Sequence, residues 1–328
     1  MRKVVGESLE SLAAYRIVEV ERPACAPGQV LIQVAACGLG YVDSLLALGR
    51  YQVKPPVPFT PGQEVAGVIA EVGEGVTGLS VGDRVMATLM GGLSEVVAAP
   101  AAVVSKTPDR LGFAEAAALR LNYLTALHAL TDRGAVQAGE WVVVMGAAGG
   151  LGAAGVQLAK LLGAKVVAVA SSPEKRAFCE ALGADAVLDT EPEGWRERLK
   201  AACGGVAPDV VFDPVCGPLF EPAFRSLNWR GRHLVLGFVG GPIPALKSNL
   251  TLMKGAALIG VDVRQFQIFE PKRTVEHVTR LLDWTATGEL VPPVGSRYPF
   301  EAFGEAMDFA LTGKSLGKIV VEITGRSD

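Results

Sequence analysis

The chain has 328 residues, more than a single hydrophobic core usually serves, which predicts two domains. Half of the residues are apolar and only 20% are charged, a composition that supports large cores and excludes intrinsic disorder. The 31 basic and 34 acidic residues give a net charge of −3, and no run of Lys or Arg exceeds two residues. These features argue against a surface that binds nucleic acid.

The first third of the chain is predicted to be mostly β. Residues 28–34 form an apolar strand after a Pro-Gly turn, and residues 65–72 form another that ends in glycines. Residues 81–85 lead from a turn into a third strand, and residues 94–99 form a fourth.

The pattern changes near residue 114, where an Ala- and Leu-rich helix is expected over 114–130. Strands and helices then alternate. Strands are expected at 141–145, 165–170, 186–188, 209–212 and 233–236, and helices at 152–162, 173–182 and 195–202. Ser172 is expected to cap the second of these helices, with Pro173 in its first turn. This alternation predicts a doubly wound α/β domain, in which helices cover both faces of a parallel sheet.

The last 70 or so residues contain an amphipathic helix at 272–287 and a final strand at 318–323. The β-rich unit lacks an obvious closing strand, so we expect this tail to fold back onto it. The chain would then comprise one domain from residues 1–119 and 257–328, with the α/β domain of residues 120–256 inserted in it.

Residues 141–159 carry no charge and match a membrane span in length. Five glycines interrupt them, so a strand, a turn and a helix are predicted instead, and no membrane is needed. The amino-terminal residues lack the apolar core of a secretory signal, and the five cysteines show no C-x-x-C spacing. We therefore expect reduced thiols and a cytoplasmic protein.

The strongest functional signal is a glycine turn at the end of the strand 141–145. Glycines occupy positions 146, 149 and 152, where a helix begins. Such a turn allows the main chain to approach a pyrophosphate, which the helix N-terminus also attracts. The predicted dinucleotide contacts are Ala148, Gly149, Gly150, Leu151 and Gly152. The alternative is a turn that only permits tight packing of helix on strand.

The next strand ends in Ser171 and Ser172, where an NAD site would usually place an acidic residue. Lys175 and Arg176 follow within one helical turn. Two hydroxyls and nearby cations suit the extra phosphate of NADPH, with Ser171, Ser172 and Lys175 as its ligands. The alternative is a solvated pair of basic residues on a helix surface.

Four segments together resemble the medium-chain dehydrogenase/reductase superfamily, specifically its zinc-free quinone oxidoreductase branch. They are residues 37–43 with 49–51, residues 61–68, residues 81–85, and the turn 147–152 with residues 157–160. The resemblance implies a GroES-like catalytic domain from both chain ends and an inserted Rossmann domain. It also implies a homodimer.

Alcohol dehydrogenases of this superfamily hold a catalytic zinc ion. Their pattern needs a thiolate where this chain has Gly40, an imidazole where it has Gln63, and a third ligand near Leu121. The four-cysteine structural loop of those relatives is missing, and the three histidines are widely spread along the sequence. We therefore predict no metal ion and an acceptor that takes hydride without one, either a quinone or an enone.

The resemblance also implies catalytic candidates. Tyr51 matches the tyrosine of the family's substrate loop, where a phenol would bond the acceptor oxygen or supply a proton; the alternative is a packing residue at a turn. Tyr41 and Asp43 match the loop that faces the nicotinamide. Asp43 could equally bond its own backbone.

Further cofactor contacts are implied by the resemblance. Val215, Phe238 and Val239 lie in the loops that follow the later strands, Thr125 lies in the helix 114–130, and Lys318 belongs to a family segment near the end of the chain. The alternative for Lys318 is a solvated residue that opens an edge strand. Cys216 is interpreted as a small packing residue, without thiol chemistry.

The leading functional hypothesis is an NADPH-dependent quinone reductase. Two departures from the branch, Gly40 in place of Asn and Leu45 in place of Tyr, make the pocket more apolar and admit bulkier acceptors. The alternative enzyme is an enoyl or alkenal reductase that acts on a 2-enoyl thioester or an enone. An alternative of another class is a non-catalytic NADPH-binding sensor or structural protein.

Overall fold

The computed structural model describes residues 1–323, which divide into two compact units. Unit 1 contains Met1–Leu121 and the chain from Leu282 onward, and unit 2 is Asn122–Leu281. Two helices contain the boundaries, α2 (Phe113–His128) and α9 (Pro271–Thr287).

Unit 1 is built mainly from antiparallel β-structure. Strands β1 (Arg2–Gly6) and β2 (Tyr15–Glu19) pair with each other. A seven-stranded sheet has the order β14-β15-β3-β4-β5-β7, with β6 also paired to β3. Its strands are β3 (Gln29–Leu39), β4 (Glu64–Val72), β5 (Arg84–Thr88), β6 (Val96–Pro100), β7 (Val104–Lys106), β14 (Val294–Pro299) and β15 (Lys318–Glu322). The helical elements are α1 (Tyr41–Ala47), α10 (Phe303–Leu311) and the short 3₁₀ turns η1 (Leu12–Ala14), η2 (Ala101–Val103) and η4 (Phe300–Ala302).

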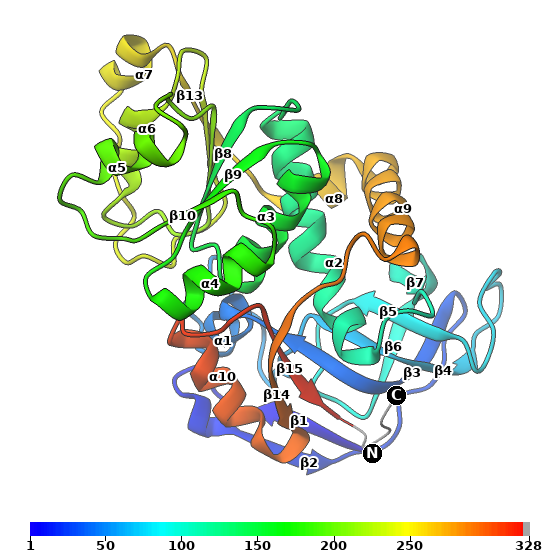
Figure 1. Ribbon diagram of the computed structural model, residues 1–328. Coiled ribbons are helices and arrows are strands. Elements are labelled where there is room, and N and C mark those ends of the chain that lie inside the picture. The colour runs from blue at the N-terminus through cyan, green and yellow to red at the C-terminus, as the bar shows by residue number, and fades with distance from the viewer. Residues whose placement is uncertain (324–328) are drawn as a thin grey trace. The chain divides into compact units, whose positions relative to one another are not determined.

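The C-terminal part of the chain does fold back onto the β-rich unit. Strand β15 pairs antiparallel with β3, with Ile319 opposite Leu39 and Val321 opposite Cys37. Figure 1 shows the red β15 beside the blue β3. Consecutive apolar residues of these strands are buried, including residues 30–32 of β3 and 319–321 of β15, so a segment from the end of the sequence completes the core of unit 1.

Unit 2 is a doubly wound Rossmann domain. Its sheet is parallel throughout and has the order β10-β9-β8-β11-β12-β13. The strands are β8 (Trp141–Met145), β9 (Lys165–Val169), β10 (Ala186–Leu188), β11 (Val210–Asp213), β12 (Arg232–Val235) and β13 (Ala257–Gly260). The helical elements are α3 (Gly150–Leu161), α4 (Pro173–Ala181), α5 (Trp195–Ala202), α6 (Phe220–Ser226), α7 (Asn249–Lys254), α8 (Val263–Phe269) and the π-helical turn η3 (Ala129–Arg133).

The strand order of unit 2 reverses at one place. The chain runs outward from β8 through β9 to β10, then returns to β11 on the other side of β8 and continues to β13. The crevice at such a reversal, at the carboxyl ends of the strands, is where sheets of this kind bind ligands. The turn after β8 lies at this point.

The second domain boundary lies later than the sequence analysis placed it. Strand β13 pairs with β12, with Ala257 opposite Arg232, so residues 257–260 complete the parallel sheet instead of returning to unit 1. Helix α8 also belongs to unit 2, which extends to Leu281. The sequence analysis missed this strand because a segment of only four residues is too short to show a clear hydrophobic periodicity.

The uncharged stretch at residues 141–159 is a strand, a turn and the start of a helix, as predicted. No helix within residues 1–323 combines the length and apolar character that a bilayer crossing requires.

Two of the three histidines are far apart in the sequence but close together in the fold. His128 and His277 both contact Asp132, because α9 packs beside the end of α2, so the inference that the histidines are dispersed is wrong for these two.

Candidate functional site

The glycine turn of unit 2 leads directly from β8 into α3. Gly146 has φ +59°, and the N–H of Gly149 donates to the carbonyl of Gly146 at 3.2 Å. Gly149 is the N-cap of α3 and has no side chain to bond the free N–H groups of the first helical turn. These groups and the helix dipole form a main-chain site suited to an anion.

Gly149 and Gly152 of the turn differ in how much space surrounds them. A Cβ on Gly152 would lie 2.2 Å from the Gly146 oxygen and 2.7 Å from the Ala147 Cα, so tight packing excludes any side chain there. A Cβ on Gly149 would meet only the Gly146 oxygen at 3.7 Å, an ordinary contact. Packing therefore explains Gly152 but not Gly149, and a bare N-cap leaves room for a ligand.

The end of β9 carries the predicted phosphate-binding residues. Ser172 is the N-cap of α4, and its hydroxyl accepts the N–H of Lys175 at 3.2 Å. Ser171 is exposed, and Lys175 is partly exposed one turn into the helix. The Arg176 guanidinium donates to the Ala170 carbonyl at 3.1 Å. The Ser172 hydroxyl thus already has a structural role, which sequence reasoning did not separate from phosphate binding.

The loops after β11 and β12 are joined by hydrogen bonds. Oδ1 of Asp213 accepts the N–H groups of Val215 and Cys216 at 2.9 and 2.8 Å, and its Oδ2 lies 3.0 Å from Nε2 of His233. The N–H of Gly240 donates to the Val215 carbonyl at 2.8 Å. This network fixes the backbone around Val215.

Other predicted cofactor contacts of unit 2 occupy different environments. Phe238 and Val239 lie exposed in the loop after β12, where large apolar side chains are available to cover a ligand. Thr125 is buried on α2. Cys216 is fully buried, as a packing residue should be, and burial raises the pKa of its thiol.

A buried polar cluster, defined here as Asp43, Gln63, Glu64 and Lys318, lies in unit 1. The Lys318 ammonium donates to Oε2 of Glu64, and Oε1 of Glu64 accepts the N–H of Leu121 at 2.6 Å. Gln63 donates its amide to Oδ1 of Asp43 at 3.3 Å. Three charged side chains are thereby held by partners inside the protein.

Lys318 does not open an edge strand, and that alternative is wrong. Strand β15 lies between β14 and β3, and the Lys318 residue is only 5% exposed. Close packing holds its side chain: a Cβ on Gly38 would lie 2.9 Å from the Lys318 Cε and 2.0 Å from the Ala117 oxygen. The contact of Lys318 with a cofactor stays a prediction.

Asp43 has the structural role that was considered as its alternative. Its Oδ2 accepts the N–H of Gly40 at 2.8 Å, which closes the first turn of α1. Burial raises the pKa of Asp43 to about 6, although Lys318 and the two hydrogen bonds act in the opposite direction. The carboxyl group therefore changes its protonation state close to neutral pH.

The two predicted tyrosines lie on either side of α1 in the sequence. Tyr41 is the first residue of α1 and is partly exposed. Tyr51 follows the helix and packs, partly buried, against the core of unit 1. Their roles in catalysis stay predictions.

Glu64 is a buried charged residue that the sequence analysis did not single out. It lies in the apolar strand β4 and is only 1% exposed. An acidic side chain within a strand of valines and alanines requires a buried partner, and this signal was available in the sequence. The identity of the partner was not, because Lys318 is 254 residues away.

Family models match both units of the chain. The model of the alcohol dehydrogenase GroES-like domain matches residues 26–109, and that of the zinc-binding dehydrogenase matches residues 150–283. The quinone oxidoreductase-like protein 2 homolog of Nematostella vectensis is 35% identical over 297 residues, 89% of this chain and 81% of that protein. Human quinone oxidoreductase is 32% identical over 301 residues, 89% of this chain and 88% of that protein. The chain belongs to the quinone oxidoreductase branch of the medium-chain dehydrogenase/reductase superfamily.

Solved structures of this superfamily share the fold. A probable oxidoreductase from Mycobacterium abscessus is 38% identical with a TM-score of 0.90, covering 98% of this chain and 99% of that chain. Escherichia coli quinone oxidoreductase, solved in complex with NADPH, is 25% identical with a TM-score of 0.89, covering 98% and 100%. The CurK enoyl reductase is 27% identical with a TM-score of 0.89, covering 98% and 99%.

Within this superfamily, the zinc-binding positions of the alcohol dehydrogenases carry no suitable donors in this chain. Gly40 has no side chain, the Gln63 amide is bonded to Asp43, and Leu121 is apolar. The nearby Cys37 thiol is fully buried, and burial raises its pKa well above the usual value. These residues do not fit an ion held by thiolate and imidazole.

Proposed function

We propose that this member of the quinone oxidoreductase branch is an NADPH-dependent, zinc-independent reductase that transfers hydride to a quinone-type acceptor. The observation that carries the proposal is the bare N-terminus of α3 at the reversal of the strand order, with a Gly149 that packing does not require. A pyrophosphate fits this combination of free N–H groups, helix dipole and open space.

Residues of unit 2 hold the cofactor in this proposal. The turn Ala148, Gly149, Gly150, Leu151 and Gly152 binds the pyrophosphate, and Ser171, Ser172 and Lys175 bind the additional phosphate. Thr125, Val215, Phe238 and Val239 contact the nicotinamide half, and Lys318 of unit 1 approaches the cofactor. Residues 170–172, directly after β9, include no acidic side chain, and this feature and the NADPH complex of the Escherichia coli enzyme support NADPH over NADH.

Residues of unit 1 act on the acceptor. NADPH supplies the hydride when bound. Tyr51 donates a hydrogen bond to the acceptor oxygen, and Tyr41 faces the nicotinamide. Asp43 has a pKa of about 6, so its carboxyl group can exchange a proton at neutral pH. The Asp43 bonds to Gly40 and Gln63 keep the loop before α1 in place.

Reduction of an activated carbon–carbon double bond is the second candidate. Gly40 and Leu45 lack the polar groups usual in quinone reductases, which favours a larger and more apolar acceptor. The similarity to the CurK enoyl reductase points in the same direction. Hydride transfer to an enone or a 2-enoyl thioester needs the same cofactor and the same proton donor.

Steady-state oxidation of NADPH with a benzoquinone and with a crotonyl thioester tests the proposal. Faster turnover of the benzoquinone supports it, and turnover of the thioester alone would establish the second candidate. NADPH binding without oxidation by either acceptor would instead indicate a non-catalytic sensor or structural protein. The variant Gly149→Val should remain folded and lose NADPH binding, and retained affinity would contradict the assignment of the turn.

We further propose a homodimer in the cytoplasm. Four of the five free cysteines are buried and only Cys25 is partly exposed, which suits a reducing compartment. Sedimentation at micromolar concentration tests the oligomeric state, and a monomer at all concentrations would contradict the dimer.

A further inference from the structure

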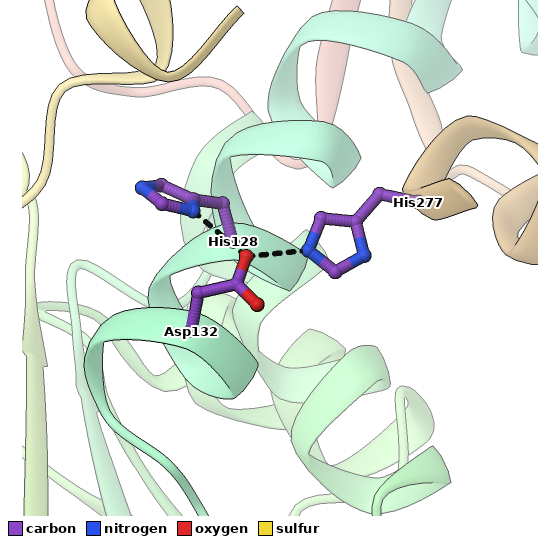
Figure 2. A group of neighbouring side chains, drawn as sticks. All are labelled: His128, Asp132 and His277. Carbon is purple, nitrogen blue, oxygen red and sulfur yellow. Dashed lines mark hydrogen bonds and ion pairs between the residues drawn. The ribbon is translucent and has the colours of Figure 1, made fainter. Parts of the chain in front are cut away.

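Two histidines of unit 2 share one carboxylate. Oδ2 of Asp132 lies 2.9 Å from Nδ1 of His128 and 2.5 Å from Nε2 of His277. Figure 2 shows both rings directed at this oxygen. His128 and Asp132 are one helical turn apart at the end of α2 and in η3, whereas His277 belongs to α9. Three donor atoms, all within 4.8 Å of one another, thus converge from two helical segments.

We propose that His128, Asp132 and His277 form a binding site for a divalent transition-metal ion of the zinc class. Two imidazole nitrogens and one carboxylate oxygen are donors that Zn²⁺ accepts, whereas Mg²⁺ and Ca²⁺ prefer oxygen alone. Three protein ligands leave the fourth tetrahedral position for water. This site is separate from the buried polar cluster and from the glycine turn, and it uses none of the residues assigned to hydride transfer.

The distances are compatible with an ion after a small adjustment. With metal–ligand bonds of about 2.0–2.2 Å, neighbouring donors in a tetrahedral site are about 3.3 Å apart. The two hydrogen bonds to Asp132 must therefore lengthen by less than about 1 Å, and the two ring nitrogens, at most 4.8 Å apart, must approach each other by no more than about 1.5 Å. Each ring binds the ion through the nitrogen that now faces Asp132, so its proton moves to the other ring nitrogen.

Neighbouring side chains orient the three donors. The Arg273 guanidinium donates two hydrogen bonds of 3.1 Å to Oδ1 of Asp132, which leaves Oδ2 to face the histidines. Phe266 stacks on His128 with 3.9 Å between ring centroids, which fixes the plane of the imidazole. Supporting contacts of this kind are typical of metal ligands, whose carboxylates and rings are held by a second set of residues.

The backbone at Asp132 is also unusual. Gly134 donates its N–H to the carbonyl of Ala129 at 2.7 Å, five residues earlier, so η3 is a π-helical turn. Such turns are rare in proteins, and those that occur often lie at functional sites. Here the widened turn carries Asp132.

The charges around the site match a divalent ion. Arg273 offsets one of three nearby negative charges: Asp132 itself, Glu276, bonded to Arg273 at 2.7 Å, and Glu270, whose charge acts on His128. These four groups together carry a charge of −2, which favours a cation.

Titration of the chelator-treated full chain with Zn²⁺, in competition with a chromophoric chelator, tests the site. We expect one ion per chain. Asp132→Asn and His277→Gln should each lower the affinity by at least about 100-fold, because ligand loss costs more than loss of a supporting contact. Asp308→Asn, which alters an exposed aspartate of unit 1, should bind as wild type. Circular dichroism establishes that the variants are folded.

Co²⁺ absorption identifies the donors. We expect the visible bands of a nitrogen- and oxygen-ligated ion without a thiolate charge-transfer band, and the same spectrum in Cys25→Ser. A thiolate band, binding unchanged in both Asp132→Asn and His277→Gln, or no saturable binding would overturn the proposal. The last result would leave a hydrogen-bonded cluster that joins two helices.

Discussion

The glycine turn of unit 2 and the buried polar cluster of unit 1 prepare their sites in opposite ways. The turn spans seven residues, offers main-chain N–H groups and contains no polar side chain. The cluster uses charged side chains that are far apart in the sequence, Glu64 of β4 and Lys318 of β15, and both are buried away from water. The first kind of site depends on local backbone geometry, and the second on the completion of a whole sheet. Substitutions should therefore damage them differently.

Loss of the buried cation should have the largest effect. Lys318→Met leaves the Glu64 carboxylate buried without its ammonium, and we expect urea unfolding to show a loss of about 3–5 kcal/mol. The double variant Lys318→Met/Glu64→Gln keeps an acceptor for the Leu121 N–H and removes the charge, so it should recover much of the loss. A double variant as unstable as the single one would show that the ion pair is not the cause.

The pH dependence of stability should reveal the buried carboxyl of the same cluster. Burial raises the pKa of Asp43 from 3.8 to about 6, so in the intervening pH range the folded protein keeps a proton that the unfolded chain has released. Relative to Asp43→Asn, the wild type should lose about 3 kcal/mol as the pH rises from about 3 to about 7. Paired urea titrations of the two proteins across this range measure the difference. A constant difference would show that Lys318 and the hydrogen bonds from Gly40 and Gln63 fully offset the effect of burial on the Asp43 pKa.

The turn offers a matched pair of glycines. Gly152→Ala places a methyl group 2.2 Å from the Gly146 oxygen and should lower the free energy of unfolding by about 1–3 kcal/mol. Gly149→Ala has room and should change it by no more than about 1 kcal/mol, while NADPH binding weakens. Thermal unfolding and NADPH titration of both variants provide the comparison. Equal destabilisation would mean that packing accounts for both glycines.

The smallest effect should come from the residues after β9 that we propose as ligands of the additional phosphate. Lys175→Ala removes one cation after β9, and we expect NADPH affinity to fall about tenfold, about 1.4 kcal/mol, with little change for NADH. Fluorescence titrations with the two nucleotides measure the ratio, and Lys200→Ala, an exposed lysine on α5, is the control. Equal losses for both nucleotides would remove Lys175 from the phosphate site.

Local patterns predicted most of the fold. Alternating strands and helices placed β8 and α5 at the observed residues, and Ser172 followed by Pro173 marked the start of α4. The short strand β13 carried too little pattern to be recognised, which placed the domain boundary too early.

The two sites differ in how far the sequence revealed them. The turn was predictable because all its determinants lie within a few residues of Gly149. The pairing of Glu64 with Lys318, and of His277 with Asp132, was not, because partners more than 140 residues apart leave no local pattern. Asp43 and Ser172 both have structural roles, because each side chain accepts a backbone N–H at the start of a helix. The amino-acid sequence alone could not distinguish these roles from catalysis or phosphate binding.

The position of β15 sets an order on folding during synthesis. All strands of unit 2 lie between Trp141 and Gly260, so its sheet can form while the ribosome is still translating the remaining codons. The sheet of unit 1 must wait for residues 318–322, which insert between β14 and β3 and bring the lysine that neutralises Glu64. Until then, the nascent amino-terminal strands expose an unpaired β3 edge, and the need for chaperone protection should be greatest in this interval.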